Sequence, residues 1–176
     1  GGAGQGAKLS IYDDIEAKLI ARGVPPGPGG VEERLVHMVR EANGRIHEMS
    51  VADDDHAGMG TTLTCAYVGD HDVTIVHVGD SRAYLLRDGE VERVTTDHSL
   101  VEELVRQGRL TPQEAEDHPQ RSIITRALGP EVDVEPDSHT IPARDGDVFL
   151  LCSDGLTDMV PEAHVADVLR AAGSLT

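Results

Sequence analysis

Apolar residues recur at helical spacing in two segments near the start of the chain. Intervals of three and four residues place them on one face of a helix, so helices are predicted over residues 7–21 and 31–50. The Gly- and Pro-rich residues 23–30 between them predict a loop. The apolar positions are Leu9, Tyr12, Ile15, Leu19 and Ile20 in the first segment, and Val31, Leu35, Val39, Ala42, Ile46 and Met49 in the second.

The pattern changes after residue 60 to short runs rich in β-branched residues, which favour strands. A tight hairpin turn is predicted at Asp88-Gly89, where both residues tolerate a positive φ. The strands are expected to form an antiparallel meander. They cover residues 61–68, 73–78, 83–87 and 91–94.

Two short polar helices are predicted between about residues 97 and 119. Ser99 with Glu102 three residues on has the pattern of a capping box, and Thr111 followed by Pro112 repeats the start signal. Because the segment is polar, we interpret it as a mobile surface flap. The later elements predicted are strands over residues 132–134 and 148–152 and a last helix from Pro161 towards Ala172.

The composition fits one domain with an aliphatic core. Of 176 residues, 39% are hydrophobic, with no Trp and one Phe, and we assign residues 1–176 to a single domain. Asp and Glu number 32 against 15 Lys and Arg, a formal net charge of −17. This charge disfavours nucleic-acid binding, because it repels a phosphate backbone. Surplus carboxylates also suit hard cations such as Mg²⁺ and Mn²⁺, which prefer oxygen ligands.

The two cysteines, Cys65 and Cys152, lie far apart in apolar runs, and each is interpreted as a small core residue. A reducing cytoplasm is the simplest location. No run approaches the ~18 apolar residues of a membrane span, and no signal segment is recognised. The sequence begins with glycine instead of Met, so we expect it to be a piece of a longer chain.

Residue spacing excludes several kinds of active site. A cysteine phosphatase needs an Arg six residues after its Cys, but Asp158 follows Cys152 and His71 follows Cys65 at that distance. No Gly-Lys pair exists for a phosphate-binding P-loop, and no serine lies in a Gly-x-Ser-x-Gly elbow. The acidic residues 53–55 lack the Gly and distal Glu of a calcium loop, and we interpret them as a solvated linker.

Acidic residues that follow two predicted strands are more informative. Asp80 comes after Gly79, which permits close backbone approach, and Asp154 comes after the strand predicted over residues 148–152. A carboxylate at the exit of a buried strand is held rigidly and can face partners from neighbouring strands. With Asp158 four residues beyond Asp154, these residues form a candidate carboxylate cluster for hard cations.

Four motifs follow one another along nearly the whole chain. They are Gly58-Met59-Gly60-Thr61-Thr62, Gly79-Asp80-Ser81-Arg82, Arg121-Ser122-Ile123-Ile124-Thr125-Arg126-Ala127-Leu128-Gly129 and Ser153-Asp154-Gly155-Leu156-Thr157-Asp158. In this order they resemble the metal-dependent PP2C-type (PPM) protein serine/threonine phosphatases of bacteria. Thr96-Asp97-His98-Ser99 also resembles the start of the flap in that family.

The resemblance implies an α+β fold, an α-β-β-α sandwich of two antiparallel sheets flanked by helices. It implies hydrolysis of phosphoserine and phosphothreonine in proteins by water that Mn²⁺ or Mg²⁺ activates. Two ions are expected in a complete domain, with a third held more weakly. The expected partners are phosphorylated proteins, and a serine/threonine kinase is left open as a further partner.

The resemblance also assigns roles to single residues. Asp154 resembles a ligand of the catalytic pair of ions, and Asp80 and Asp158 resemble ligands of the third ion. Arg126 is expected to brace the sheet through an ion pair. His98 is expected to be a loop residue and not a proton donor.

The sequence departs from the family pattern at both ends. The family carries a phosphate-binding Arg and an Asp-Gly-Met-Gly-Gly motif near its start, of which Gly1-Gly2 resemble the last two residues, and an Asp-Asn motif near its end. Because the Arg, the bridging Asp and the closing motif are missing here, we expect a partial domain that is inactive alone. The alternative is a non-catalytic PP2C-like binding or regulatory module without a complete metal site.

Overall fold

The computed structural model describes residues 30–52 and 54–173. The helix predicted over residues 7–21 and Gly1-Gly2 lie outside the described residues. No helix within the two described ranges is both long enough and apolar enough to cross a membrane.

A long amphipathic helix, α2 (Gly30–Ala52), confirms the helix predicted over residues 31–50. Its first turn carries two glutamates, which complement the positive end of the helix dipole. One of them, Glu32, accepts hydrogen bonds from the hydroxyls of Ser138 at 2.6 Å and Thr140 at 2.9 Å. The apolar side chains that pack on the neighbouring strands are Leu35, Val36, Val39 and Ile46.

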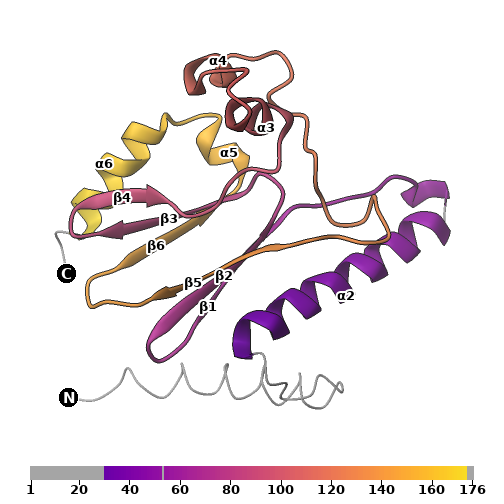
Figure 1. Ribbon diagram of the computed structural model, residues 1–176, viewed down its shortest axis with the longest axis horizontal. Coiled ribbons are helices and arrows are strands. Elements are labelled where there is room, and N and C mark those ends of the chain that lie inside the picture. Colours follow the sequence, from indigo (N-terminus) through magenta and orange to yellow (C-terminus); the bar gives the residue numbers. More distant parts are fainter. Residues whose placement is uncertain (1–29, 53, 174–176) are drawn as a thin grey trace.

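Within the described residues, the strands form two three-stranded antiparallel sheets (Figure 1). The first has the order β1-β2-β5 and the second β4-β3-β6. Their bounds are β1 (Leu63–Val68), β2 (Asp72–Val78), β3 (Arg82–Arg87), β4 (Glu90–Arg93), β5 (Asp137–Pro142) and β6 (Val148–Cys152).

The antiparallel meander predicted for the first four strands is wrong in one respect. β1–β2 and β3–β4 are hairpins, but β2 and β3 belong to different sheets. The chain leaves the first sheet at Gly79, whose φ of 111° turns it out of the strand. The predicted hairpin turn is confirmed, since Asp88 and Gly89 have φ values of 53° and 80°.

Alternating side chains along β2 and β3 build four layers. Val73 and Ile75 of β2 meet Ala83 of β3 between the two sheets. On the outer faces, β2 packs under α2, and β3 packs against α6 (Glu162–Gly173). The α-β-β-α sandwich is thereby confirmed. The buried outer residues are Val76 and Val78 of β2, Tyr84 and Leu86 of β3, and Val165 and Leu169 of α6.

Residues 132–134 do not form the strand predicted for them, and the strand of this region begins at Asp137. The buried side chain of Asn43 on α2 donates hydrogen bonds to the carbonyls of Glu131 at 3.1 Å and Val132 at 3.0 Å. These bonds attach the segment to the helix in an irregular conformation.

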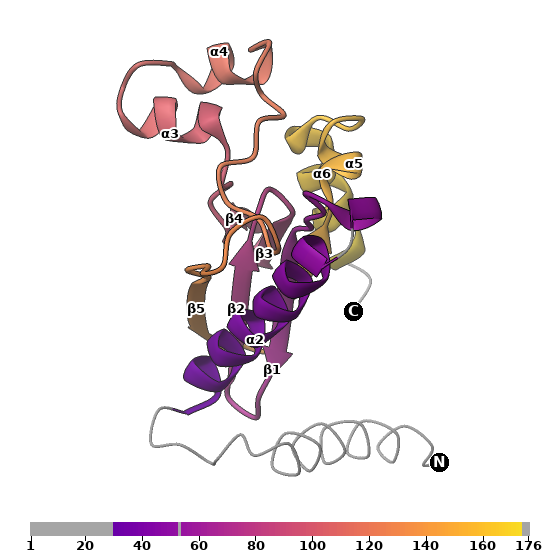
Figure 2. The ribbon, with the colours of Figure 1, turned by 90° about the vertical axis from the view of Figure 1, so that its right-hand side faces the viewer.

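The segment between β4 and β5 contains two short helices, α3 (Leu100–Arg106) and α4 (Pro112–Glu116). Both project beyond the ends of the sheets (Figure 2). Thr111 and Glu114 form a complete capping box at the start of α4. Ser99 caps α3, but the side chain of Glu102 pairs with another residue and does not complete the predicted box.

The base of this segment is packed into the molecule. Asp97, His98 and Ser99 are buried, whereas most of residues 106–117 are exposed. We therefore divide the segment into a flap base (residues 97–99) and a flap tip (residues 106–117). The exposure expected of a surface flap holds for the tip but not for the base.

Two single-turn helices and α6 complete the fold. The first, η1 (Asp54–His56), is exposed to solvent, as expected of the solvated linker predicted there. The second, α5 (Asp154–Thr157), has no counterpart among the predicted elements. The strand over residues 148–152 and the last helix are confirmed. Cys65 and Cys152 are free, pack against the apolar clusters as predicted, and have thiol pKa values raised by burial.

Candidate metal centre

Asp80 lies in the turn that joins the two sheets. Gly79 before it has no room for a side chain, because a Cβ atom there would lie 2.3 Å from the Thr62 methyl carbon. Two hydrogen bonds fix Ser81, the residue after Asp80. Ser81 Oγ lies 2.9 Å from Thr62 Oγ1, and the Ser81 carbonyl accepts a hydrogen bond from Thr64 Oγ1 at 2.9 Å. The turn that carries Asp80 is therefore rigid.

Asp154 reaches the same end of the sandwich from β6. Cys152, the last residue of β6, pairs in register with Arg82, the first residue of β3. Asp154 then occupies the first turn of α5 and is exposed. Strand pairing thus brings the two predicted carboxylates to one place, although Asp80 and Asp154 lie 74 positions apart in the sequence.

The pKa of the Asp80 carboxyl reflects the proximity of Asp154. Burial and then the negative charge of Asp154 raise the pKa of the Asp80 carboxyl, while its own backbone N–H opposes the shift. A hard divalent cation relieves repulsion of this kind and takes oxygen ligands. Asp80 and Asp154 therefore fit part of a metal site, and both could hold such an ion.

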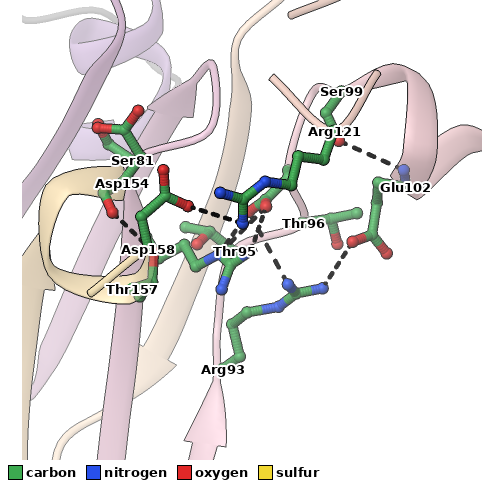
Figure 3. A network of polar contacts seen from close by, with 12 residues as sticks. Ser81, Arg93, Thr95, Thr96, Ser99, Glu102, Arg121, Asp154, Thr157 and Asp158 are labelled. Atoms are coloured by element: carbon green, nitrogen blue, oxygen red, sulfur yellow. Dashed lines mark hydrogen bonds and ion pairs between the residues drawn. The ribbon is translucent and has the colours of Figure 1, made fainter. Parts of the chain in front are cut away.

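Asp158 has a different environment. It is the C-cap residue that follows α5, and its carboxylate lies 3.5 Å from the guanidinium of Arg121, with both side chains half exposed (Figure 3). No group of three or more His, Cys, Asp or Glu side chains in the described ranges is arranged to hold a metal ion. The structure thus brings Asp80 and Asp154 together and leaves Asp158 paired with an arginine beyond the flap tip.

Partly buried ion pairs connect the second sheet to the flap base. Arg82 makes a bidentate pair with Asp97, with the shortest contact at 2.6 Å. Arg93 on β4 lies 3.9 Å from Asp97 and 3.0 Å from Glu102 on α3 (Figure 3). This network was not predicted from the sequence, although Arg82 and Asp97 both lie in motifs that resemble those of the family.

Two buried histidines lie behind the Asp80 turn, with ring centres 4.8 Å apart. Burial and the neighbouring His98 lower the pKa of His77 to about 4. Burial also lowers the pKa of His98, against the effect of Asp137. Both rings are therefore neutral near pH 7. The predicted brace is confirmed, since Arg126 lies 2.7 Å from the Asp137 carboxylate.

Comparison with known proteins gives a consistent result. Residues 28–175 match the model of the family described as protein phosphatase 2C. The chain is 43% identical over 146 residues to the serine/threonine phosphatase Stp of Listeria welshimeri, covering 83% of this chain and 58% of the relative. This chain thus spans little more than half of that protein.

Solved structures show the same fold. The serine/threonine phosphatase Stp1 of Staphylococcus aureus matches with a TM-score of 0.77 and 32% identity, over 97% of this chain and 72% of that one. The catalytic domain of the phosphatase PstP, solved in complex with two manganese ions, matches with a TM-score of 0.69 and 36% identity, over 97% and 78%. The family match, the identity to these phosphatases and the shared sandwich agree: the chain belongs to the protein phosphatase 2C family.

Proposed function

We propose that this chain is part of a metal-dependent phosphatase that hydrolyses phosphoserine and phosphothreonine in proteins. The observation that carries the proposal is the meeting of Asp80 and Asp154 at the end of the sandwich, with the pKa of Asp80 raised by burial and by the Asp154 charge. The names of the relatives support the substrate class, and the manganese in the PstP structure supports the metal.

A complete domain would hold two Mn²⁺ or Mg²⁺ ions, with a third held more weakly. This chain would supply part of the ligands of these ions. Asp154 would bind the catalytic pair, and Asp80 would bind the third ion together with Asp158. Such ions lower the pKa of water and neutralise charge on the transferred phosphoryl group. For Asp158 to join them, its pair with Arg121 must open, because one carboxylate cannot satisfy both partners at full strength.

The rest of the chain holds these carboxylates in place. The turn at Gly79 fixes Asp80, and the first turn of α5 carries Asp154. The substrate's phosphoryl group must come from kinases that act on serine and threonine, because those are the enzymes that make such esters. Two free thiols fit a reducing compartment, so we place the protein in the cytoplasm.

The test is Asp154→Ala in a complete domain that contains this chain. Loss of a ligand removes metal and charge balance together, so hydrolysis of p-nitrophenyl phosphate with Mn²⁺ should fall by at least about 100-fold. Asp133→Ala removes an exposed carboxylate elsewhere and is the matched control.

Two results would contradict the proposal. Wild-type turnover by Asp154→Ala with Mn²⁺ present would reject the role of Asp154. A complete domain that binds phosphoproteins but hydrolyses no phosphate ester with either metal would favour the non-catalytic module instead.

A further inference from the structure

His98 in the flap base is joined to Gly79 by a reciprocal pair of hydrogen bonds. The backbone N–H of His98 donates to the carbonyl of Gly79 at 2.7 Å. In return, the backbone N–H of Gly79 donates to Nδ1 of the His98 ring at 3.0 Å, and this second bond is fully buried. The residue immediately before Asp80 is therefore held by a side chain as well as by the backbone.

The far side of the ring is also fixed. Nε2 of His98 lies 2.9 Å from Nη1 of Arg126 and 3.2 Å from one carboxylate oxygen of Asp137. The same Arg126 nitrogen donates to the other Asp137 oxygen at 2.7 Å. Because Nδ1 accepts a hydrogen bond, a neutral ring carries its proton on Nε2, and of the two groups beside Nε2 only the Asp137 carboxylate can accept it. Arg126 is itself anchored, since it donates to the carbonyl of Glu135 at 2.9 Å.

His98 also joins the two ends of the flap. Its carbonyl accepts a hydrogen bond from the N–H of Thr125 at 2.8 Å, beyond the flap tip. The turn it contacts is closely packed, because a Cβ atom at Gly79 would lie 2.3 Å from the Thr62 methyl carbon. His98 thus sits where the flap, the first sheet and the Asp80 turn meet.

We propose that His98 is a positioning residue for Asp80, which acts by holding the N–H of Gly79 through Nδ1 while Asp137 and Arg126 orient the ring. The inference rests on the proposed function only in taking Asp80 as a metal ligand. The contacts of His98 with Gly79 and Asp137 are observed in this structure and do not depend on that function. Nothing in the position of His98 requires it to touch substrate or metal.

Two substitutions separate the two sides of the ring. His98→Asn keeps an acceptor near the position of Nδ1 and loses the reach to Asp137. His98→Gln keeps a donor near the position of Nε2 and loses the acceptor that faces Gly79. In this chain, hydrogen exchange of the Gly79 amide should stay slow in His98→Asn and become at least about 10-fold faster in His98→Gln. Equal exchange rates in the two variants would overturn the inference.

The consequence for metal binding is measured in a complete domain. Mn²⁺ titration by calorimetry should show a weak site that Asp80→Ala removes. His98→Gln should weaken Mn²⁺ binding at that site by about 10-fold or more, because it removes a residue that orients the ligand. His98→Asn should retain most of the wild-type affinity. A merely structural role predicts that both variants lose thermal stability and Mn²⁺ affinity in parallel, which would also overturn the inference.

The two proposals fail in different ways. If the Gly79 exchange pattern holds but Asp80→Ala leaves Mn²⁺ binding unchanged, the error lies in the metal assignment of Asp80. If Asp80→Ala removes a site that both histidine variants retain at wild-type affinity, His98 has no positioning role.

Discussion

At the scale of single residues, the polar interior behind the Asp80 turn makes stability depend on pH. His77 is fully buried, with Nε2 3.1 Å from the carbonyl of Thr96 and Nδ1 2.9 Å from the hydroxyl of Thr64. Its pKa falls from the ordinary 6.5 to about 4. As the pH drops through 6.5, the unfolded chain takes up a proton that the folded chain refuses until about pH 4, so stability is lost in that window.

We therefore expect the free energy of unfolding to fall between pH 7 and pH 5 by about 2 kcal/mol through His77 alone. His98 shifts in the same direction and adds to the loss. Urea unfolding at the two pH values measures it. His77→Gln should show a smaller difference, whereas His164→Gln, at an exposed histidine, is the control. An identical pH difference in wild type and His77→Gln would contradict the expectation.

The candidate carboxylates could be found from sequence because they are local features. Asp80 follows a glycine at the end of an apolar strand, and Asp154 comes two residues after the end of another. The partners of His98 could not be found in this way. Asp137 comes close to His98 only because β5 pairs with β2. No local sequence pattern indicates that these two strands pair.

At the scale of elements, the segments with strong local signals were predicted and those fixed by distant contacts were not. The hairpin at Asp88-Gly89 and the capping box at Thr111 depend on neighbouring residues only. β5 was missed because its outward residues are polar and find their partner in Glu32 on α2. The apolar run over residues 132–134 looked like a strand, but Val134 packs in the core without pairing.

Asn43 is the residue that attaches this irregular segment to α2. It is 1% exposed, donates to two carbonyls and accepts from the N–H of Gly129 at 2.8 Å. Asn43→Ala leaves these backbone groups unpaired, so we expect unfolding to require about 2–4 kcal/mol less free energy. The midpoint of urea unfolding measures this loss.

Arg40→Ala provides the comparison on the same helix. It removes an exposed ion pair with Glu135, which contributes about 1 kcal/mol or less. Equal losses in the two variants would show that the hydrogen bonds of Asn43 do not hold the segment in place.

At the scale of the whole molecule, the fold gathers its chemistry at one end. The exits of β2 and β6 place Asp80 and Asp154 there, and α3 of the flap and α5 lie toward the same end of the sandwich (Figures 1 and 2). Arg121 and Asp158 contact each other across this region. The hairpin turn at Asp88 lies at the opposite end of the second sheet, away from the proposed metal centre (Figure 1).

The separation of flap base and flap tip predicts how the two affect activity. Replacing residues 106–117 with a Gly- and Ser-rich loop of the same length leaves Arg82, Asp97 and His98 in place. In a complete domain, hydrolysis of a phosphoprotein should fall by about 10-fold or more, because the exposed tip can contact only a large substrate. Hydrolysis of p-nitrophenyl phosphate should stay within about 2-fold of wild type, because its site depends on the base and the sheet ends.

The matched variant for this experiment alters the base. Asp97→Asn weakens the bidentate pair with Arg82 beside the Asp80 turn, so it should depress hydrolysis of both substrates together. Circular dichroism and thermal unfolding establish that each variant is folded. If the tip replacement slows both substrates equally, the tip supports the metal centre itself, and the division between a structural base and a substrate-contacting tip is wrong.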